Sequence, residues 1–337
     1  MSELLDGLGR PIHDLRISVT DRCNFRCTYC MPREVFDNHK FLPRQELLTF
    51  EEIERLVRLF AGQGVRKVRL TGGEPLVRND LETLVERLAA IDGIDDIAMT
   101  SNVSLMTAKR AQSLRDAGLN RINVSLDALD DETFKAINDV DVSVQQVLDG
   151  IAHCAAAEFD EIKINMVVKK GLNEHSILPM AKFFKGTGQI LRFIEFMDVG
   201  NANGWIPEEV FTAAEIVEMI NAELPIAPTD ANYSGEVAKR WSYTDGGGEV
   251  GVIASVSEPF CGGCHRARLS AVGQLFTCLF ASFGHDFRAP LREGASDQEI
   301  LARLQSIWQH RKDRYSEVRA SLAGTPIKKV EMSYIGG

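Results

Sequence analysis

The chain has 337 residues and a formal net charge of −10, from 48 acidic and 38 basic residues. A nucleic-acid partner is not expected, because a surface that binds a phosphate backbone is basic. No stretch approaches the ~18 apolar residues of a membrane span, and the N-terminus has no basic start followed by an apolar core, so neither a membrane span nor a targeting segment is predicted. Seven cysteines, six of them in two tight groups, indicate metal ligands rather than disulfides and favour a reducing cytoplasm.

Strand-like runs alternate with amphipathic helical patterns through the first 200 residues. The expected strands are Leu15–Val19, Lys67–Leu70, Asp96–Thr100, Arg121–Leu126, Glu161–Val168 and Ile190–Met197. A capping box at Thr49 begins the first helix, and further helices are expected over Asp80–Ala90, Thr107–Ala117, Ser143–Ala157 and Glu174–Lys185. Strict alternation predicts a parallel sheet with right-handed crossovers. Six units instead of eight predict an α/β fold with a partial (βα)6 barrel, open on one side.

The alternation stops after Asn201. A linker with several glycines and prolines is expected to lead to a hairpin of Glu236–Tyr243 and Glu249–Val256, joined at Asp245-Gly-Gly-Gly. A helix is expected from Ser296 to about Tyr315. We therefore expect two parts, a barrel over residues 1–200 and a C-terminal α+β extension over residues 201–337.

Three cysteines follow the first expected strand at the spacing C-x3-C-x2-C: Cys23, Cys27 and Cys30. A structural zinc site takes four protein ligands, and a cubane iron–sulfur cluster capped entirely by protein takes four thiolates. Three thiols can therefore hold three irons of a four-iron cluster and leave the fourth iron open for chemistry. A zinc knot that lacks its fourth ligand is the alternative.

A second group of three thiols, Cys261, Cys264 and Cys278, lies in the extension. Two glycines between the first two cysteines let the backbone wrap closely around a metal and leave its amide groups free to bond sulfur. A second cubane with an open iron is the preferred interpretation. Zinc completed by His265 is the alternative, although a residue adjacent to Cys264 reaches the same ion with difficulty. Cys154 lies on an apolar helix face and is expected in the core.

Basic residues stand in four of the six expected strands: Arg16, Arg69, Lys163 and Arg192. An unpaired charge in a buried sheet is costly, so these side chains predict a positive barrel interior that holds a polyanion. Pairing with carboxylates such as Glu195 is the alternative for one or two of them. If residues 266–270 are extended, Arg266 and Arg268 share a face beside the second thiol group and can bind an oxyanion between them. The alternative is that both arginines are simply exposed to solvent.

Polar motifs follow the expected strands at one rim of the sheet. Gly72-Gly73-Glu74-Pro75 follows the second strand, Ser101-Asn102 the third, Asp127 the fourth and Asp198 the sixth. Ligands in parallel sheets bind beyond the carboxyl ends of the strands, so this rim is the expected site. The glycine pair is alternatively an ordinary turn.

Several motifs together resemble a known family. The first thiol loop and Thr71-Gly-Gly-Glu-Pro75 resemble the radical S-adenosylmethionine (SAM) enzymes, and the match to the MoaA family of GTP 3′,8-cyclases, which act in molybdenum cofactor biosynthesis, runs from about Leu15 to Gly337. The other segments that carry it are Arg121-Ile-Asn-Val-Ser-Leu-Asp127, Arg192-Phe-Ile-Glu-Phe-Met-Asp198, the second thiol group, Arg266-Ala-Arg268 and the final Gly-Gly. Val103 departs from the family, which usually has glycine there, and a β-branched residue does not readily take a positive φ.

The resemblance implies roles for individual residues. The six grouped cysteines would carry two [4Fe-4S] clusters, and the SAM site would be lined by Tyr29, Gly73, Ser125 and Met197. Substrate GTP would be held by Arg16, Arg69, Thr100, Lys163, Arg192, Arg266, Ala267 and Arg268, with guanine on the open iron of the second cluster. Gly336 and Gly337 would insert toward the active site and take part in catalysis, whereas a frayed terminus is the alternative.

The resemblance also implies a reaction. A 5′-deoxyadenosyl radical from SAM would take hydrogen from C3′ of the ribose, and the carbon radical would attack C8 of guanine to give (8S)-3′,8-cyclo-7,8-dihydroguanosine 5′-triphosphate. Expected partners are GTP, a one-electron reductant, a downstream cyclic pyranopterin monophosphate synthase and a second copy in a homodimer. A radical SAM enzyme that modifies peptides is the alternative function, and an electron-transfer protein with two clusters or a zinc-binding interaction module would be alternatives outside that class.

Overall fold

One curved sheet organises the fold of the computed structural model, which describes residues 3–233, 235–322 and 327–336. Its strand order is β12-β11-β10-β1-β2-β3-β4-β5-β6-β9-β8-β7. The strands are β1 (Asp14–Ser18), β2 (Lys67–Thr71), β3 (Asp96–Ser101), β4 (Arg121–Ser125), β5 (Glu161–Val168), β6 (Ile190–Glu195), β7 (Ile226–Thr229), β8 (Lys239–Tyr243), β9 (Glu249–Ile253), β10 (Arg266–Leu269), β11 (Gln274–Phe276) and β12 (His285–Asp286). All six strands expected in the first 200 residues are present, each within about two residues of its expected bounds.

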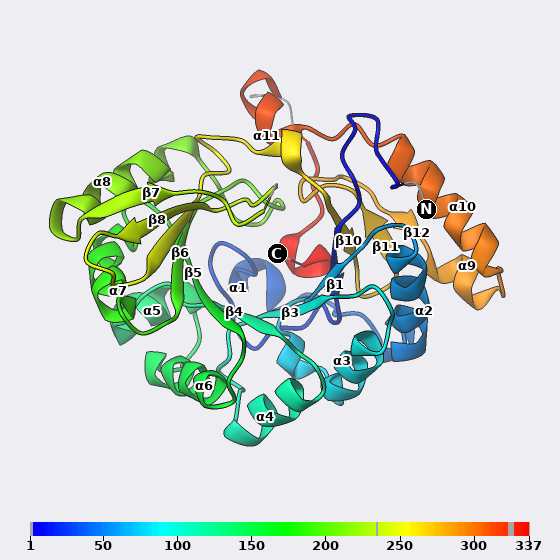
Figure 1. Ribbon diagram of the computed structural model, residues 1–337, viewed down its shortest axis with the longest axis horizontal. Helices are drawn as coiled ribbons and strands as arrows, with labels where there is room; N and C mark the ends of the chain where they lie inside the picture. The colour runs from blue at the N-terminus through cyan, green and yellow to red at the C-terminus, as the bar shows by residue number, and fades with distance from the viewer. Residues whose placement is uncertain (1–2, 234, 323–326, 337) are drawn as a thin grey trace.

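Most of the helices cover the outside of this sheet, whereas α1 and α12 lie within its curve in the view of Figure 1. The helices of the described residues are α1 (Arg33–Phe36), α2 (Phe50–Ala61), α3 (Leu81–Ala89), α4 (Ala108–Asp116), α5 (Asp131–Asn138), α6 (Val144–Ala156), α7 (Ile177–Phe184), α8 (Ala213–Glu223), α9 (Arg288–Arg292), α10 (Asp297–Gln309), α11 (Tyr315–Val318) and α12 (Met332–Ile335). Both views place α10 beside α2, where Arg55 pairs with Asp297 at 2.8 Å, and Figure 1 places the C-terminal α12 near the centre. No helix in the described part of the chain is long and apolar enough to cross a membrane.

The predicted capping box forms at the start of α2. The Thr49 hydroxyl accepts from the amide of Glu52 at 3.2 Å, and the Glu52 carboxylate accepts from the amide of Thr49 at 2.8 Å. This reciprocal pair satisfies two amides that the first turn leaves without partners. The helix then buries Ile53, Leu56, Val57, Leu59 and Phe60 against the sheet, as the 3.6-residue spacing predicts.

The extension adds strands to both edges of the barrel sheet. Strand β10 pairs in parallel with β1, and β9 pairs in parallel with β6, so the parallel part of the sheet runs from β10 to β9. The terminal strands of the sheet are β12 and β7, so among the described residues the barrel stays open, as expected. The sheet crosses the expected boundary at residue 200, and the division into residues 1–200 and 201–337 stays a prediction.

The expected linker after Asn201 holds more structure than predicted. Helix α8 and strand β7 lie in it, ahead of the predicted hairpin of β8 and β9, which forms with antiparallel pairing. Thr212 and Glu215 make a capping box at the start of α8, so the S/T-x-x-E signal for this helix was present in the sequence. Helix α5, which Asp130 caps, was also not predicted, and α10 ends at Gln309 instead of about Tyr315.

Candidate active site

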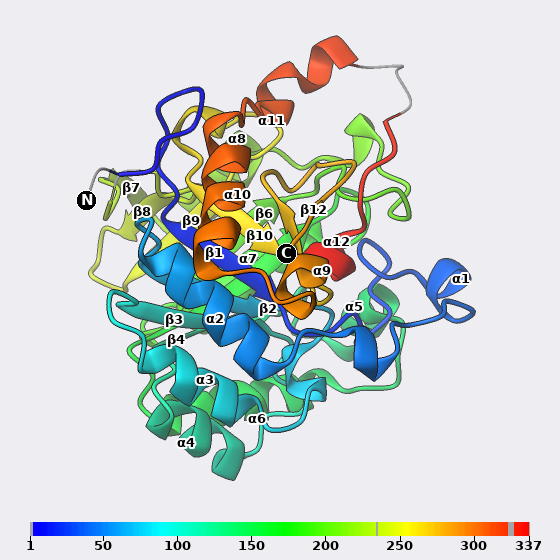
Figure 2. The ribbon, with the colours of Figure 1, turned by 90° about the vertical axis from the view of Figure 1, so that its right-hand side faces the viewer.

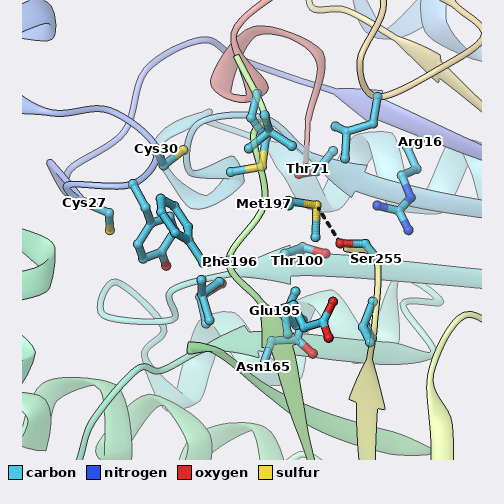
Figure 3. Close-up of a pocket in the computed structure, with 18 of the residues that line it drawn as sticks. Arg16, Cys27, Cys30, Thr71, Thr100, Asn165, Glu195, Phe196, Met197 and Ser255 are labelled. Carbon is cyan, nitrogen blue, oxygen red and sulfur yellow. Dashed lines mark hydrogen bonds between the residues drawn. The ribbon is translucent and has the colours of Figure 1, made fainter. Parts of the chain in front are cut away.

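All six grouped cysteines line one cavity. This cavity encloses about 1870 Å³ of atom-free space, including the part open to solvent. Its wall carries both thiol groups, the Gly72-Gly73-Glu74 turn, Ser101-Asn102 and Asp127, so the rim expected from the strand order is the place where the site lies. Figure 3 shows Cys27, Cys30, Thr71 and Arg16 around this space. The two thiol groups, which are more than 230 positions apart in the chain, therefore face a shared interior.

The first thiol loop leaves β1 and turns tightly between its second and third cysteines. The amides of Cys30 and Met31 both donate to the Cys27 carbonyl, at 2.9 and 2.8 Å. Burial raises the pKa of the Cys23 thiol to about 12, and burial also raises the pKa values of Cys27 and Cys30 well above their ordinary value. The thiols are therefore protonated at neutral pH unless iron replaces the proton, as it does in thiolate ligation.

The placement of the thiols bears on the two metal alternatives. Among the described residues, no three His, Cys, Asp or Glu side chains converge closely enough to hold one metal ion. A zinc knot needs such convergence, and this includes zinc completed by His265. A cubane binds each thiolate to a different iron, so its ligands surround the cluster instead of meeting at a point. The arrangement fits two cubanes better than either zinc site.

The glycine pair after β2 packs against the first thiol loop. A Cβ at Gly72 would lie 2.4 Å from the Thr20 carbonyl oxygen, and one at Gly73 would lie 2.3 Å from the Arg22 carbonyl oxygen. Both positions therefore need glycine because backbone approaches backbone. The close contact at these glycines is thus with the loop that carries Cys23.

Glu74 joins the ends of β2 and β3. Its buried carboxylate accepts from the Leu76 amide at 2.9 Å, the Ser101 hydroxyl at 2.7 Å and the Asn102 amide at 2.7 Å. Burial raises the pKa of Glu74, although these hydrogen bonds oppose that effect. With its acceptors occupied by the protein, Glu74 holds the rim together.

Tyr29, between the second and third cysteines, is fixed by Asp127 at the end of β4. The Tyr29 hydroxyl donates to Asp127 Oδ2 at 2.7 Å, and the Val167 amide donates to Asp127 Oδ1 at 2.8 Å. Burial raises the pKa of Asp127 to about 6. Ser125 and Met197 line the same cavity, and the Ser255 hydroxyl lies 3.4 Å from the Met197 sulfur (Figure 3). The predicted SAM-site residues Tyr29, Gly73, Ser125 and Met197 are thus brought together on one wall.

The second thiol group lies beside two guanidinium groups. Arg266 Nη2 and Arg311 Nη2 lie 3.4 and 3.2 Å from Cys264 Sγ. Burial alone would raise the pKa of Cys264, but these two positive charges outweigh it and lower the pKa to about 6. Burial raises the pKa of Cys278 to about 11. The sequence analysis did not single out Arg311, because nothing local links it to a cysteine 47 positions earlier.

Three arginines form a row across neighbouring strands. In the register of the sheet, Arg16 on β1 is opposite Arg268 on β10 and Arg69 on β2. Like charges directly opposite one another destabilise a sheet. Burial, and then the charges of Arg268 and Arg69, lower the pKa of Arg16 well below its ordinary value. Arg16 Nε, Arg69 Nε and Thr100 Oγ1 are buried and have no hydrogen-bond partner among the described residues. A row of this kind fits a polyanionic ligand.

The other basic residues of the strands are partly satisfied by the protein. Lys163 pairs with Glu161 at 2.5 Å, and burial lowers the pKa of Lys163 to about 8. Arg192 donates to the side-chain oxygens of Asn165 and Asn123 at 3.0 and 2.5 Å, and burial lowers its pKa to about 9. Pairing therefore accounts for Lys163. These two side chains and Arg69 do not line the cavity itself.

Glu195 and Ala267 both make contacts within the protein. The alternative in which Glu195 neutralises strand cations does not hold, because its carboxylate accepts from the amides of Ala213, Val256 and Ser257 at 2.8, 2.8 and 2.9 Å. Side chains alternate along β10, so the Ala267 methyl group is packed in the apolar core on the face opposite Arg266 and Arg268. A substrate contact at Ala267 stays a prediction, which its backbone would have to make.

The C-terminal segment reaches the same region. Gly336 is buried with φ 75°, and Arg268 Nη1 donates to its carbonyl oxygen. A Cβ at Gly336 would lie 2.1 Å from Thr71 Cγ2, so only glycine fits there. This placement contradicts a frayed end at Gly336, whereas Gly337 lies outside the described residues. Asp198, expected on the rim, pairs with Arg319 at 2.9 Å and with Lys329 at 2.5 Å, which anchors the segment that leads to Gly336.

Comparisons with known proteins agree with this site. Residues 17–184 match the family model "Radical SAM superfamily", and residues 189–317 match "Molybdenum Cofactor Synthesis C". The chain is 52% identical over 332 residues to a GTP 3′,8-cyclase of Xanthomonas campestris pv. campestris (strain B100), covering 98% of this chain and 97% of that protein. It is 48% identical over 341 residues to a GTP 3′,8-cyclase of Staphylococcus aureus (strain JH9), covering all of both chains.

A solved structure agrees on the fold. The crystal structure of Streptococcus suis SuiB superposes with a TM-score of 0.57 at 14% identity, covering 93% of this chain and 69% of that one. At this identity the likeness concerns the fold alone. The sequence matches, which extend over nearly the whole chain, show that this protein belongs to the radical SAM superfamily and, within it, to the GTP 3′,8-cyclase (MoaA) family.

Proposed function

We propose that this protein converts GTP to (8S)-3′,8-cyclo-7,8-dihydroguanosine 5′-triphosphate, an early step of molybdenum cofactor biosynthesis. The observation that carries the proposal is that two groups of three thiols, the partly buried Arg16 and the buried Arg268 line one cavity. The thiols fit two [4Fe-4S] clusters, and the arginines fit a triphosphate. When bound, the first cluster and SAM supply a 5′-deoxyadenosyl radical; the protein supplies binding and orientation.

The residues divide between the two ends of the cavity. We assign Cys23, Cys27 and Cys30 to the first cluster and Cys261, Cys264 and Cys278 to the second. Tyr29, Gly73, Ser125 and Met197 would bind SAM, and the hydrogen bond from Tyr29 to Asp127 would hold the tyrosine ring still while SAM is bound. This rigidity matters because a displacement of about 1 Å at the reacting atoms costs orders of magnitude in rate.

GTP would bind with its triphosphate across the arginine row. Arg16, Thr100, Arg266 and Arg268, which line the cavity, are proposed contacts. Arg69, Lys163 and Arg192 stand on β2, β5 and β6 outside its lining, and we propose that they contact the part of GTP that extends beyond it. The unpartnered nitrogens of Arg16 and Arg69 would gain acceptors, and the unfavourable closeness of like charges would become favourable once the triphosphate lies among them. Gly336 and Gly337 would complete the cavity wall near the ribose, because Gly336 already lies against Thr71 and Arg268.

The alternative of a peptide-modifying radical SAM enzyme does not explain the arginine row. A peptide backbone is uncharged and would leave Arg16, Arg69 and Arg268 without counter-charges, which is costly in a buried site. The likeness to SuiB concerns the fold and lends no support to a peptide substrate.

Other parts of the proposal concern partners and location. A one-electron reductant must act on the first cluster, and the cyclised triphosphate would pass to a cyclic pyranopterin monophosphate synthase. Seven free cysteines in the described residues suit a reducing cytoplasm. A homodimer remains part of the proposal and is testable by light scattering.

The deciding experiment is anaerobic turnover of the reconstituted protein with SAM, dithionite and GTP. We expect 5′-deoxyadenosine and the cyclised triphosphate to form in equal amounts, and only when GTP is present. The control variant Arg268→Ala should retain its iron but bind GTP about ten- to a hundredfold more weakly, because a charge-assisted contact contributes about 1.5–3 kcal/mol. Formation of 5′-deoxyadenosine without a cyclised product, or unchanged GTP binding to Arg268→Ala, would overturn the assignment.

A further inference from the structure

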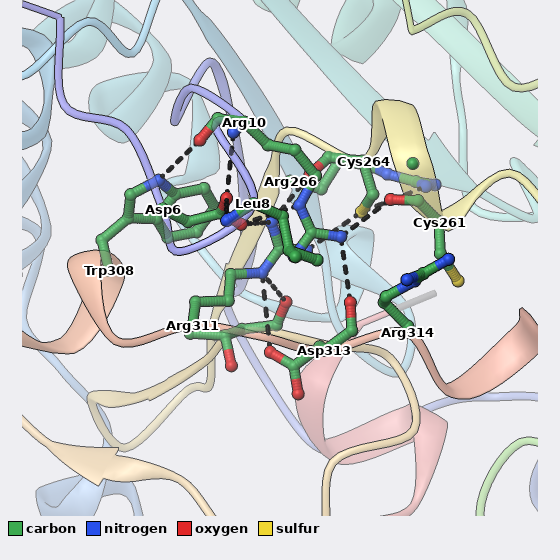
Figure 4. A network of polar contacts seen from close by, with 12 residues as sticks. Asp6, Leu8, Arg10, Cys261, Cys264, Arg266, Trp308, Arg311, Asp313 and Arg314 are labelled. Atoms are coloured by element: carbon green, nitrogen blue, oxygen red, sulfur yellow. Dashed lines mark hydrogen bonds and ion pairs between the residues drawn. The ribbon is translucent and has the colours of Figure 1, made fainter. Parts of the chain in front are cut away.

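Three buried charged residues form a cluster behind the second thiol group, outside the lining of the cavity (Figure 4). They are Asp6 and Arg10 from the N-terminal segment and Arg311, which follows α10. Their side chains are 0%, 3% and 1% exposed. Buried charges need a physical reason, because removing an ion from water costs several kcal/mol. Neither substrate nor SAM supplies that reason, since none of the three faces the cavity.

Arg311 is bonded both to the thiol region and to carboxylates, because besides Asp6 its Nε lies 3.5 Å from Asp313 Oδ2. Its Nη2 lies 3.2 Å from Cys264 Sγ, its Nη1 donates to the Cys264 carbonyl at 2.7 Å, and its Nε donates at 3.0 Å to the carbonyl of Thr277, which precedes Cys278. The guanidinium plane lies over the Trp308 ring, 4.6 Å from its centroid. A planar guanidinium group that is bonded on several sides in this way has a single orientation, and one of its nitrogens points at the Cys264 sulfur.

Arg10 holds the remaining cysteine of the group. Its Nη1 donates to the Cys261 carbonyl at 2.7 Å and to the Asp313 carbonyl at 2.9 Å. Asp6 joins the two arginines, because its Oδ2 accepts from Arg10 Nε at 2.7 Å and from Arg311 Nη1 at 3.0 Å. The backbone beside each of the three cysteines is thus bonded to one of two arginines that share one carboxylate.

This arrangement has an electrostatic consequence for whatever the thiolates bind. A cation that donates a hydrogen bond to a ligating sulfur stabilises negative charge there, and hydrogen bonds to cluster sulfurs are among the factors that set a cluster's reduction potential. A buried carboxylate that bonds the same cation on the side away from the sulfur has the opposite effect on the reduction potential. It weakens the bond of the guanidinium group to the sulfur, and it adds negative charge near the cluster. Both effects are strong here because the groups are shielded from water.

We propose that Arg311 is a positioning residue that raises the reduction potential of the second iron–sulfur cluster through its bond to Cys264, and that Asp6 sets the size of this effect by holding Arg311 from behind. The inference rests on the proposed function, which places a [4Fe-4S] cluster on Cys261, Cys264 and Cys278. The N-terminal segment thereby contributes to a site that lies more than 250 residues away in the sequence.

The test isolates the second cluster. In the full chain with Cys23, Cys27 and Cys30 replaced by Ala, one cluster should remain, and its one-electron reduction by dithionite is followed by electron paramagnetic resonance at controlled potentials. Arg311→Gln should shift the potential negatively, so that the reduced-to-oxidised ratio at a fixed potential falls about tenfold, which is about 59 mV for one electron. Arg311→Lys keeps the positive charge but loses the planar guanidinium geometry, so it should shift the reduction potential less.

Asp6→Asn separates an electrostatic role from a merely structural one. This substitution removes a negative charge and weakens the bond that holds Arg311 away from the Cys264 sulfur. The reduction potential should therefore become more positive, whereas Arg311→Gln should make it more negative. A loosened loop would move both variants in the same direction. Arg303→Gln is the matched control, because it removes the same charge from an exposed position on α10 and should leave the potential unchanged.

The outcomes are separable from failure of the proposed function. Unchanged potentials in Arg311→Gln and Asp6→Asn, or shifts of the same sign, would overturn the inference. If Arg311→Gln does not assemble the second cluster, Asp6→Asn alone tests the inference. A reduction potential that does not rise in Asp6→Asn would then reject the role proposed for Arg311. Cyclisation is measured separately in the chain with all its cysteines; its absence would reject the proposed function while the measured potentials still decide the role of Arg311.

Discussion

Arg16 and Arg268 lie opposite each other in register across β1 and β10, so two guanidinium groups of like charge share one row of a buried sheet. A fold selected only for stability would not place them there, since like charges directly opposite each other are unfavourable. We therefore interpret the row as a binding surface for an anion. Binding of that anion offsets the repulsion between the like charges of the arginines.

This gives the first prediction. Arg16→Met should stabilise the protein without ligand by about 1–3 kcal/mol, because an apolar side chain replaces a buried, incompletely bonded charge. The same variant should lose most of the stabilisation that GTP gives the parent protein. Urea unfolding with and without GTP measures both effects.

Arg121→Met is the matched comparison. Arg121 stands on β4 of the same sheet but pairs with Asp96 and, at 3.0 Å, with Glu161. Its removal should destabilise the protein, because two carboxylates each lose one of their two cationic partners. If both variants change stability in the same direction, the distinction between paired and unpaired arginines is wrong.

The second prediction concerns Val103, which takes φ 47° although it is β-branched and fully buried. Its neighbour Gly150 on α6 makes room for it: a Cβ there would lie 2.3 Å from the Val103 carbonyl oxygen and 3.0 Å from Val103 Cγ2. In a helix, Gly→Ala ordinarily stabilises by up to about 1 kcal/mol. Here the clash should prevail, and Gly150→Ala should destabilise by about 1–3 kcal/mol. A higher unfolding free energy in Gly150→Ala would contradict this prediction and show that the loop carrying Val103 can move away from the added methyl group at little cost.

Much of the fold could be predicted from the sequence because its signals are local. Alternation of β-strand and helix patterns identified β1 to β6, and the order of the chain placed their following motifs on one rim. The pairing of β9 and β10 with the barrel edges could not be predicted, since it joins β10 to a strand about 250 positions earlier in the chain. The arginine row depends on that register, and the bond of Arg311 to Asp6 depends on two distant segments meeting.

The third prediction tests the two thiol groups. Replacing Cys23, Cys27 and Cys30 by Ala should halve the iron and sulfide bound after reconstitution and abolish cleavage of SAM. Cys154→Ala is the control, because this buried thiol packs in the apolar core and should affect neither quantity. Full iron content in the triple variant would contradict the assignment of the first cluster.

The fourth prediction is a pH dependence of stability from Asp127. Burial raises its pKa from an ordinary 3.8 to about 6 in the folded protein. Below about pH 4 the carboxyl is protonated in both the folded and the unfolded state, so it has no effect. Between about pH 4 and pH 6 the unfolded state loses this proton while the folded state keeps it, so stability falls by about 3 kcal/mol over this range, at 1.36 kcal/mol per pKa unit, and stays lower above pH 6.

Asp127→Asn should remove this dependence. The unfolding free energy of the iron-free variant, relative to the parent, should therefore increase between pH 4 and pH 7. Urea titrations at several pH values measure the difference. A difference that stays constant over this range would show that the Asp127 carboxyl does not have a raised pKa.

The last prediction concerns Gly336, whose missing side chain lets the C-terminal segment lie against Thr71. In Gly336→Ala a Cβ would lie 2.1 Å from Thr71 Cγ2, so the segment must move away. Iron content should be retained, because the thiols are untouched. GTP affinity should fall less than in Arg268→Ala, because Arg268 loses its bond to the Gly336 carbonyl but keeps its charge. Cyclisation should fall at least about tenfold, since groups at the reacting centre are displaced. Gly171→Ala is the control for backbone strain: Gly171 has φ 77° and open space around it, so cyclisation should be unchanged. Thr71→Ser removes the clashing methyl group and should restore part of the activity of Gly336→Ala; parental activity in Gly336→Ala itself would show that the terminus has no part in the reaction.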